Sequence, residues 1–170
     1  MKIGIVLGSD SDLEVMLEAV KVLDALEVGC EVFVSSAHRT PKRTEEYASS
    51  AAGRGLGVLI GAAGGAAALP GVLAASSPLP VIGVPIASTP LGGVDALFSI
   101  AQMPPGVPVA TVAVGKWGAT NAAILAAQIL ATADPALAKR LADYRARLAA
   151  QVDERQSRVT ERIAAARAQS

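Results

Sequence analysis

The stretch Glu31–Pro41, EVFVSSAHRTP, decides the fold of this chain. Its first five residues are typical of a β-strand. Thr40 followed by Pro41 is typical of a helix start, with the threonine as N-cap and the proline in the first helical position. The turn between them holds His38, the only histidine, and Arg39. A strand, a short turn and a helix in this order predict an α/β protein whose ligand site lies at the carboxyl edge of a sheet.

Short apolar runs and amphipathic helices alternate on both sides of this stretch. We predict strands at residues 2–7, 31–35, 56–60, 81–85 and 109–114, and helices that begin near residues 11, 41, 70, 119 and 134. The alternation favours an α/β fold, namely a three-layer α/β/α sandwich with a flavodoxin-like parallel sheet and a long C-terminal helix. We divide the chain into an α/β catalytic domain, residues 1–132, and a C-terminal helical extension, residues 133–170. We expect this extension to pack on the domain or on a neighbouring subunit.

Local signals refine this outline at two places. Ser11 and Glu14 have the spacing of a capping box, in which the serine caps the first helix and the glutamate reaches back. The segment 87–108 is rich in proline and glycine, and we interpret it as one long connection. A connection of that length is usually functional or packs at an interface.

The charge balance excludes several classes of protein. Fifteen basic and fifteen acidic residues give a formal net charge of zero, so nothing indicates a nucleic-acid or membrane surface. Between Arg54 and Lys116 the only charged residue is Asp95. Prolines and glycines interrupt this neutral stretch, so no run of about 20 apolar helical residues remains to cross a membrane. We expect buried strands, ligand loops and a surface that meets other subunits, hence a homo-oligomer.

Cysteine, histidine and the start of the chain limit the chemistry further. Cys30 is the only cysteine, which excludes an internal disulfide, and we interpret it as a buried structural thiol. One histidine and one cysteine cannot build a metal site, and no dinucleotide-cofactor fingerprint is present. The first residues turn polar too soon for a signal peptide, so we expect a cytoplasmic protein.

Three predicted strand-end loops converge at one edge of the sheet: residues 8–12, 36–39 and 61–65. The first offers hydroxyls and backbone N–H groups at a helix start, which suit a phosphate, whereas its aspartates suit ribose hydroxyls or simply cap the helix. Arg39 can bind a phosphate with two hydrogen bonds. Gly64 and Gly65 allow the backbone to approach a small ligand. Histidine commonly gives and takes protons near neutral pH, which makes His38 the candidate for proton transfer.

Several motifs, taken together, resemble a known family. They are the GSDSD of residues 8–12, the SAHRTP of 36–41, the GGAAALPG of 64–71, the SIAQMP of 99–104 and the NAA of 121–123. In this order and spacing they closely resemble the class I N5-carboxyaminoimidazole ribonucleotide mutases of purine biosynthesis, over about residues 2–150. The resemblance implies a cytosolic octamer without a cofactor, whose sites are shared between subunits. We expect the segment near residues 99–104 to complete a neighbour's site.

The resemblance also implies a reaction and the residues that perform it. The enzyme would move a carboxylate from the exocyclic nitrogen to the ring carbon of 5-aminoimidazole ribonucleotide, with His38 transferring the protons. Substrate ligands carried over from the family are Ser9, Asp12 and Arg39, with Ser36, Gly64 and Gly65 as pocket backbone. A closed apolar pocket at residues 62–68 would retain carbon dioxide and exclude water.

One position departs from the family pattern. Class I members have histidine in the Ala-His-Leu-Pro-Gly motif at the position that Ala68 occupies here. This departure leaves a non-catalytic binder of phosphoribosyl ligands open as an alternative. A second alternative is a direct carboxylase that uses carbon dioxide.

Overall fold

The structure, a computed structural model, describes residues 1–168 and contains one five-stranded parallel sheet. Its strands are β1 (Lys2–Leu7), β2 (Cys30–Val34), β3 (Leu56–Gly64), β4 (Val81–Ile86) and β5 (Ala110–Thr111). They lie in the order β2-β1-β3-β4-β5, which is the flavodoxin-like order. The predicted fold class is therefore confirmed, and the switch point of the sheet lies between β1 and β3.

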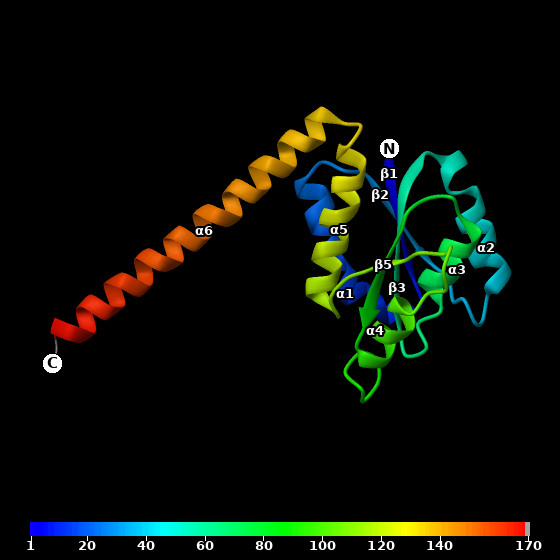
Figure 1. Ribbon diagram of the computed structural model, residues 1–170, viewed down its shortest axis with the longest axis horizontal. Helices are drawn as coiled ribbons and strands as arrows, with labels where there is room; N and C mark the ends of the chain where they lie inside the picture. Colours follow the sequence, from blue (N-terminus) through cyan, green and yellow to red (C-terminus); the bar gives the residue numbers. More distant parts are fainter. Residues whose placement is uncertain (169–170) are drawn as a thin grey trace.

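Helices cover both faces of the sheet. They are α1 (Leu13–Ala25), α2 (Pro41–Ser50), α3 (Leu69–Ser76), α4 (Val94–Ala101), α5 (Lys116–Ala131) and α6 (Pro135–Ala168), with short 3₁₀ turns η1 (Asp10–Asp12) and η2 (Ala52–Arg54). Figure 1 shows α1 and α5 together on one side of the sheet, and α2 and α3 on the other. Helix α4 packs on the same side as α2 and α3, against β4 and β5.

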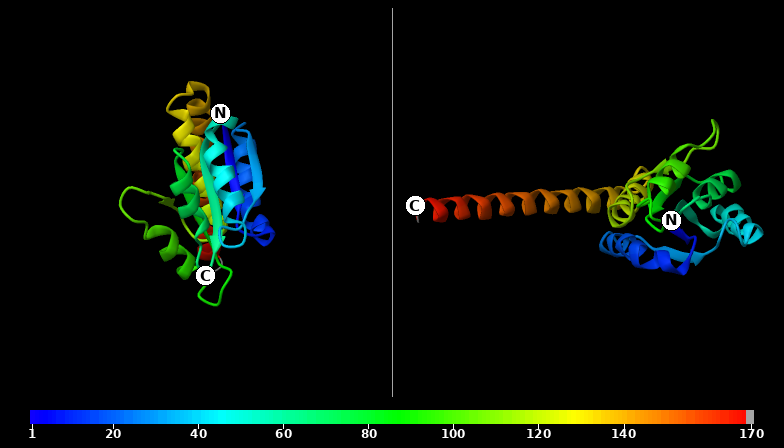
Figure 2. Two further views of the ribbon diagram at one scale, coloured as in Figure 1. Left: turned by 90° about the vertical axis from the view of Figure 1, so that its right-hand side faces the viewer. Right: turned by 90° about the horizontal axis from the view of Figure 1, so that it is seen from below.

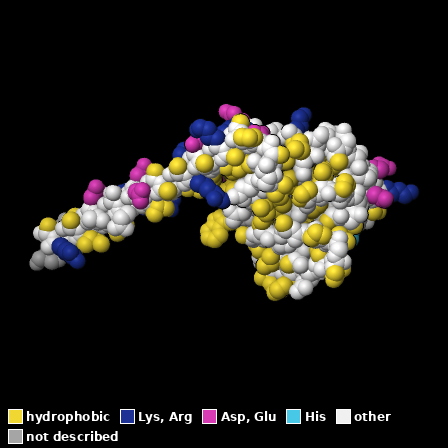
Figure 3. Space-filling model, turned by 45° about the horizontal axis from the view of Figure 1, so that its top comes forward, with side chains coloured by type: hydrophobic (Ala, Val, Ile, Leu, Met, Phe, Trp, Pro, Cys, Tyr) yellow, Lys and Arg dark blue, Asp and Glu magenta, His cyan; other side chains and the backbone are white. Residues whose placement is uncertain are grey.

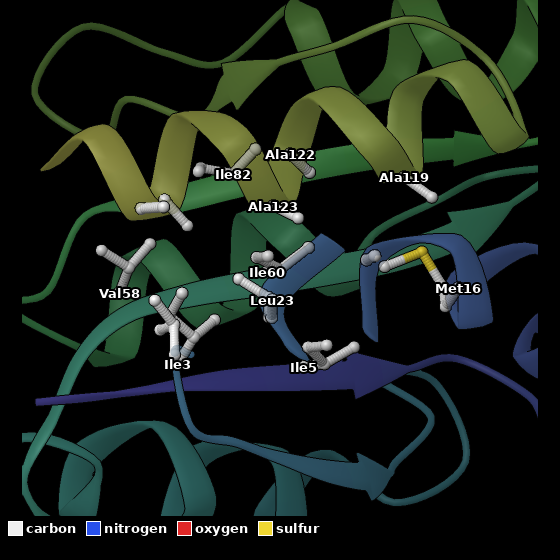
Figure 4. Close-up of a cluster of buried hydrophobic side chains, with 14 of the residues drawn as sticks. Ile3, Ile5, Met16, Leu23, Val58, Ile60, Ile82, Ala119, Ala122 and Ala123 are labelled. Atoms are coloured by element: carbon white, nitrogen blue, oxygen red, sulfur yellow. The ribbon is translucent and has the colours of Figure 1, made fainter. Parts of the chain in front are cut away.

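The larger core lies between the sheet and the pair α1 and α5. Helix α5 contributes five fully buried alanines to it: Ala119, Ala122, Ala123, Ala126 and Ala127. Their methyl groups are short, so the helix backbone comes close to the isoleucines of the strands and to Met16 and Leu23 of α1 (Figure 4). The sheet and the two helices therefore pack closely, as is usual in protein interiors, which contain few voids.

The structure corrects four of the predicted elements. β3 continues to Gly64, so residues 61–64 are strand and the loop begins only at Gly65. Within the segment interpreted as one long connection, residues 94–101 form α4, and its inward residues Ala96 and Ile100 are buried. β5 covers only two residues, whereas α5 begins at Lys116, three residues earlier than expected.

The predicted capping box at Ser11 and Glu14 is wrong. The chain turns directly after β1, and the box forms at Ser9 and Asp12 instead. The N–H of Ser11 donates to Ser9 Oγ at 3.4 Å, and the N–H of Ser9 donates to Asp12 Oδ2 at 3.0 Å. A 3₁₀ turn therefore precedes α1 and holds both side chains at the sheet edge.

The C-terminal extension leaves the domain as one helix. Asp134 caps α6 through a 3.0 Å hydrogen bond from the N–H of Leu137, as the sequence predicts. Leu137 and Leu141 are buried against the domain, and beyond them α6 runs outward on its own (Figure 2). Its later apolar residues are exposed: Leu148, Val152, Val159 and Ile163. Residues 169 and 170 of the predicted extension lie outside the described part.

The surface of the domain reflects the neutral middle of the sequence. On the face in Figure 3, hydrophobic side chains cover much of the domain body and charged ones are sparse, whereas charged side chains follow α6. The exposed large apolar residues of the domain include Leu91, Phe98 and Trp117. Over residues 1–168, no helix is both long and apolar enough to cross a membrane.

Candidate active site

A cavity of about 170 Å³ opens at the carboxyl edge of the sheet, beside the switch point between β1 and β3. Loops after four strands surround it, because the carboxyl ends of parallel strands meet at one edge. Its wall consists of Gly8, Ser9, Ser11, Asp12, Ser36, Ala37, His38, Ala63, Gly64, Ala67, Ala68, Leu69 and Ser88. The cavity wall therefore combines hydroxyls, a carboxylate and an imidazole with methyl groups and backbone.

His38 lies in the turn at residues 37–39, and hydroxyl groups fix this turn. Thr40 is the N-cap residue of α2, but its side chain does not cap the helix. Its hydroxyl accepts from the N–H of Ser36 at 3.1 Å and donates to the Ser36 carbonyl at 3.0 Å. Beneath the turn, the buried Ser35 hydroxyl contacts those of Thr40 at 3.2 Å and Thr44 at 2.8 Å. The turn is thus held in place by neutral groups.

Asp12 lies at the bottom of the Ser9 turn and is only 5% exposed. Burial raises the pKa of its carboxyl above the usual value, although hydrogen bonds from the N–H groups of Ser9 and Gly8 act in the opposite direction. Asp10, by contrast, is exposed and accepts hydrogen bonds from the Ser9 hydroxyl and the N–H of Ser11. Of the two aspartates, only Asp12 lines the cavity.

Gly64 ends β3 and forms part of the cavity wall. A Cβ added there would lie 2.8 Å from Ser88 Cβ and closer still to its hydroxyl, so only glycine leaves room for the loop after β4. Gly65 has a φ of +60° and Ala67 a φ of +42°, which turn the chain sharply into α3. The Ser99 hydroxyl of α4 donates to the Ala66 carbonyl and supports this turn from outside.

A second, more open groove adjoins the cavity, and we call it the outer groove. Its lining consists of Gly8, Ser9, Asp10, Val34, Ser35, Ser36, Arg39, Thr40 and Arg43. Arg39 is placed here, where its backbone N–H and Nε donate to Ser36 Oγ at 3.2 and 3.4 Å. Because Gly8, Ser9 and Ser36 line both hollows, one extended ligand can occupy the two together.

The structure brings most of the predicted site residues together and separates two of them. His38, Ser9, Asp12, Ser36 and Gly64 line the cavity, whereas Arg39 lines only the outer groove and Gly65 lines neither. The expected closed apolar pocket is wrong for the single chain: only part of residues 62–68 lines the cavity, and His38 is exposed at its mouth. Cys30 is partly buried on β2, away from both hollows.

Sequence reasoning missed Ser88, Ser35 and Thr44. Ser88 reaches the cavity from the loop after β4, and no local pattern indicates that it meets Gly64. Ser35 and Thr44 are nine residues apart and share a hydrogen bond inside the strand–turn–helix unit. Ser35 directly follows the strand and Thr44 lies one turn into the next helix. This spacing is the sequence signal from which their contact could have been predicted.

A parallel sheet with a histidine-bearing cavity at its switch point defines an enzyme of flavodoxin-like architecture that acts on a small molecule. The AIR carboxylase family matches residues 2–151, and the chain belongs to this family.

Individual relatives agree with this assignment. The N5-carboxyaminoimidazole ribonucleotide mutase of Pyrococcus abyssi is 58% identical over 144 residues, which cover 85% of this chain and 82% of that protein. The mutase of the same name from Synechocystis is 52% identical over 155 residues, covering 91% and 87%. The crystal structure of Treponema denticola PurE superposes with a TM-score of 0.81 at 26% identity and covers 92% of this chain and 96% of that one.

Proposed function

We propose that this protein is an isomerase of purine biosynthesis, on the route to IMP. It converts N5-carboxyaminoimidazole ribonucleotide to 4-carboxy-5-aminoimidazole ribonucleotide. The observation that carries the proposal is one cavity whose wall combines His38 and the polar residues Ser9 and Asp12 with several alanines. Relatives that are more than half identical to this chain bear the name of this mutase.

We assign proton transfer to His38 and retention of carbon dioxide to the alanines of the cavity wall. When the bond between the exocyclic nitrogen and the carboxyl carbon breaks, carbon dioxide leaves and the nitrogen takes a proton from protonated His38. The ring carbon then attacks the retained carbon dioxide, a carbon–carbon bond forms, and the neutral imidazole takes the proton from that ring carbon. His38 thereby returns to its starting state, and no cofactor is needed. Ala63, Ala67 and Ala68 offer the apolar surface on which carbon dioxide is held.

Substrate binding is assigned to the polar residues of the cavity wall and to the outer groove. Asp12 accepts hydrogen bonds from ribose hydroxyls, and Ser9 and Ser36 lie where the cavity meets the groove. Arg39 binds the phosphate, since its guanidinium forms no ion pair with any residue between 1 and 168. Gly64 has no side chain, so the base of the substrate can approach the backbone there. Gly65 contributes through its turn rather than by contact.

Ala68 lies in the cavity wall, at the position where the family pattern has histidine. His38 is therefore the only imidazole available, and the mechanism above uses a single proton carrier. Ala68 leaves space beside the substrate that a water can fill if at least two polar partners are near.

The functional molecule in this proposal is a cytoplasmic homo-octamer. Phe98 is 60% exposed and Trp117 81% exposed in the single chain, and such apolar surface usually marks an interface. The C-terminal extension, residues 133–170, presents its exposed apolar residues to a neighbouring subunit. Light scattering at micromolar concentration is expected to give a mass eight times the 17.1 kDa of one chain, and a monomer would contradict the octamer.

Turnover of purified protein tests the function. With N5-carboxyaminoimidazole ribonucleotide as substrate, the carbon-carboxylated product should form at a rate that does not depend on added bicarbonate. A direct carboxylase would require 5-aminoimidazole ribonucleotide and would respond to bicarbonate. A binder without activity would take up the ribonucleotide and release it unchanged. Either of the last two results would overturn the proposal.

A further inference from the structure

Arg43 lines the outer groove although it lies outside the SAHRTP motif. It is the third residue of α2, and its guanidinium carbon lies 4.5 Å from the centroid of the Phe33 ring. Both Arg39 and Arg43 therefore border a groove that continues into the cavity through Ser9 and Ser36. Two guanidinium groups on one groove form a site for a doubly charged anion.

An aromatic stack fixes the position of Arg43. The rings of Phe33 and Tyr47 are stacked, with centroids 4.4 Å apart and an angle of 11° between their planes. Arg54 covers the far side of Tyr47 at 4.4 Å, so the order of the layers is Arg43, Phe33, Tyr47 and Arg54. A cation over an aromatic face gains free energy and loses freedom of movement. Arg43 is thus oriented before any ligand arrives.

The charges of the stack leave Arg43 available. Among residues 1–168, Glu31 is the only carboxylate bonded to the stack, and it accepts from the Tyr47 hydroxyl at 2.8 Å and from Arg54 at 3.1 Å. Within residues 1–168, Arg43 forms no ion pair with any carboxylate. Asp10 also borders the groove, but its carboxylate accepts from the Ser9 hydroxyl and the Ser11 N–H. The groove therefore presents more positive than negative charge.

The start of α2 adds to this preference for an anion. Its first turn carries no acidic residue, and the Thr40 side chain does not cap it because the Thr40 hydroxyl bonds to Ser36 instead. The amino end of a helix carries partial positive charge, which a phosphate can neutralise. Thr40 itself lines the groove, so this end of the helix lies at the same place as the two arginines.

We propose that Arg43 is a second phosphate-binding residue, which acts with Arg39 and makes the enzyme prefer the ribonucleotide over the corresponding nucleoside. Phe33 is the positioning residue that holds the Arg43 guanidinium over the groove. The inference rests on the proposed function, because it requires that the phosphate of the substrate occupy the outer groove.

Replacing Arg43 with leucine tests the assignment through the split between KM and kcat. In Arg43→Leu the KM for the ribonucleotide should rise about tenfold, as expected for one lost charge-assisted hydrogen bond, whereas kcat should change less than about twofold. Inhibition by ribose 5-phosphate should weaken by a similar factor. Binding of the nucleoside, which has no phosphate, should stay as in the unmodified protein.

Neighbouring variants serve as controls. Lys42→Leu removes the same charge from the adjacent residue of α2, which does not line the groove, and should leave KM within about twofold. Arg43→Lys keeps the charge without the planar group and should lie between the two leucine variants. Phe33→Leu leaves Arg43 in place without its stack, so KM should rise while nucleoside binding stays unchanged.

Two results would overturn the role of Arg43. The first is an equal rise of KM in Lys42→Leu and Arg43→Leu, which would indicate only the general field of a basic helix. The second is an unchanged KM in Arg43→Leu, or an equal loss of nucleotide and nucleoside binding. Failure of the proposed function is recognised separately, because the unmodified protein would then not convert the ribonucleotide, whatever Arg43→Leu does to its binding.

Discussion

Asp12 combines a structural hydrogen bond with a place in the cavity wall. Its carboxylate fixes the N–H of Ser9, and burial raises its pKa. A carboxyl whose pKa is higher in the folded than in the unfolded chain destabilises the fold once it ionises. The free energy of unfolding therefore falls as the pH rises from the ordinary value of 3.8 through the folded pKa.

Asp12→Asn is consequently expected to separate stability from binding. The amide oxygen can still accept from Ser9, so at pH 7 the variant should unfold at the same or a higher temperature than the unmodified protein. This gain should vanish below about pH 3, where both states of the native carboxyl are protonated. Ribonucleotide affinity at pH 7 should fall about tenfold with loss of the charged acceptor. The opposite result would be an Asp12→Asn variant that matches the unmodified protein at acid pH but is less stable than it at pH 7. That result would show that the ionised carboxylate stabilises the fold.

His38→Asn is predicted to abolish turnover without abolishing binding. Asparagine keeps a polar group of similar reach but cannot carry a proton between nitrogen and carbon. General acid–base catalysis supplies about 10²–10⁴-fold, so kcat should fall by that factor while titration still shows ribonucleotide binding. A variant that retains more than about a tenth of the rate would remove His38 from the mechanism.

Ala68→His tests what the departure from the family pattern costs. If the missing ring only fills space and bonds the ligand, its return should lower KM and leave kcat nearly unchanged. We expect this outcome, because His38 already serves as the single proton carrier. A rise of kcat by about a hundredfold would instead show that a second imidazole takes part in proton transfer.

At the scale of elements, the strand–turn–helix unit around His38 could be predicted because its signals are local. The alternation of apolar runs, the Thr-Pro helix start and the Asp134 cap each lie within a few residues. The end of β3 could not be predicted in this way. Residues 61–64 are glycine and alanine, whose small side chains carry no strand signal, and their place in the sheet depends on pairing with β1 and β4.

The same reasoning explains α4 and the site residue Ser88. Prolines and glycines flank residues 94–101 on both sides, so a sequence pattern indicates a loop although Ala96 and Ile100 are buried against the sheet. Contact between Ser88 and Gly64 joins two strand-end loops that are distant in the sequence. Contacts of this kind follow from the assembled sheet and not from the composition of either segment.

Gly64→Ala is the prediction that belongs to this contact. The new methyl group would overlap Ser88, so the loop after β4 must shift, at a cost of about 1–3 kcal/mol in stability and with a larger loss of activity. Ser88→Gly in the same chain should restore part of the stability, because it removes the overlapping atoms. Gly53→Ala is the matched control, since no atom lies within 4 Å of a Cβ there, and it should unfold as the unmodified protein does. Denaturant titrations of five proteins measure these differences: the unmodified protein, the two single variants, their double variant and Gly53→Ala. Additive effects of the two substitutions would contradict the contact.

At the scale of the whole molecule, α6 runs outward from the domain and exposes its later apolar residues, among them Val152, Val159 and Ile163 (Figure 2). Removing residues 149–170 keeps Leu137 and Leu141, so the free energy of unfolding of the domain should change by less than about 1 kcal/mol. The proposed octamer should dissociate into smaller species, because the exposed apolar residues Val152, Val159 and Ile163 are lost. Sedimentation velocity checks both the mass and the shape.

Point variants distinguish the two faces of α6. Val152→Asn should weaken the assembly, whereas Glu154→Asn, two residues further along and therefore on another side of the helix, should not. If the truncated chain assembles with the same number of subunits as the full chain, α6 takes no part in assembly. Loss of folding on truncation would instead place the helix within the domain.

The hydroxyl cluster beneath the His38 turn has a consequence for kinetics. Serine and threonine hydroxyls do not titrate in water, so Ser35, Thr40 and Thr44 bond in the same way from acid to alkaline solution. The imidazole can therefore gain and lose its proton on a support that does not itself respond to acidity. Crystal structures or spectra recorded at different pH values should then show the same backbone conformation for this turn. An inflection in the pH–rate profile would report the reacting group and not a loosening of the turn that holds it.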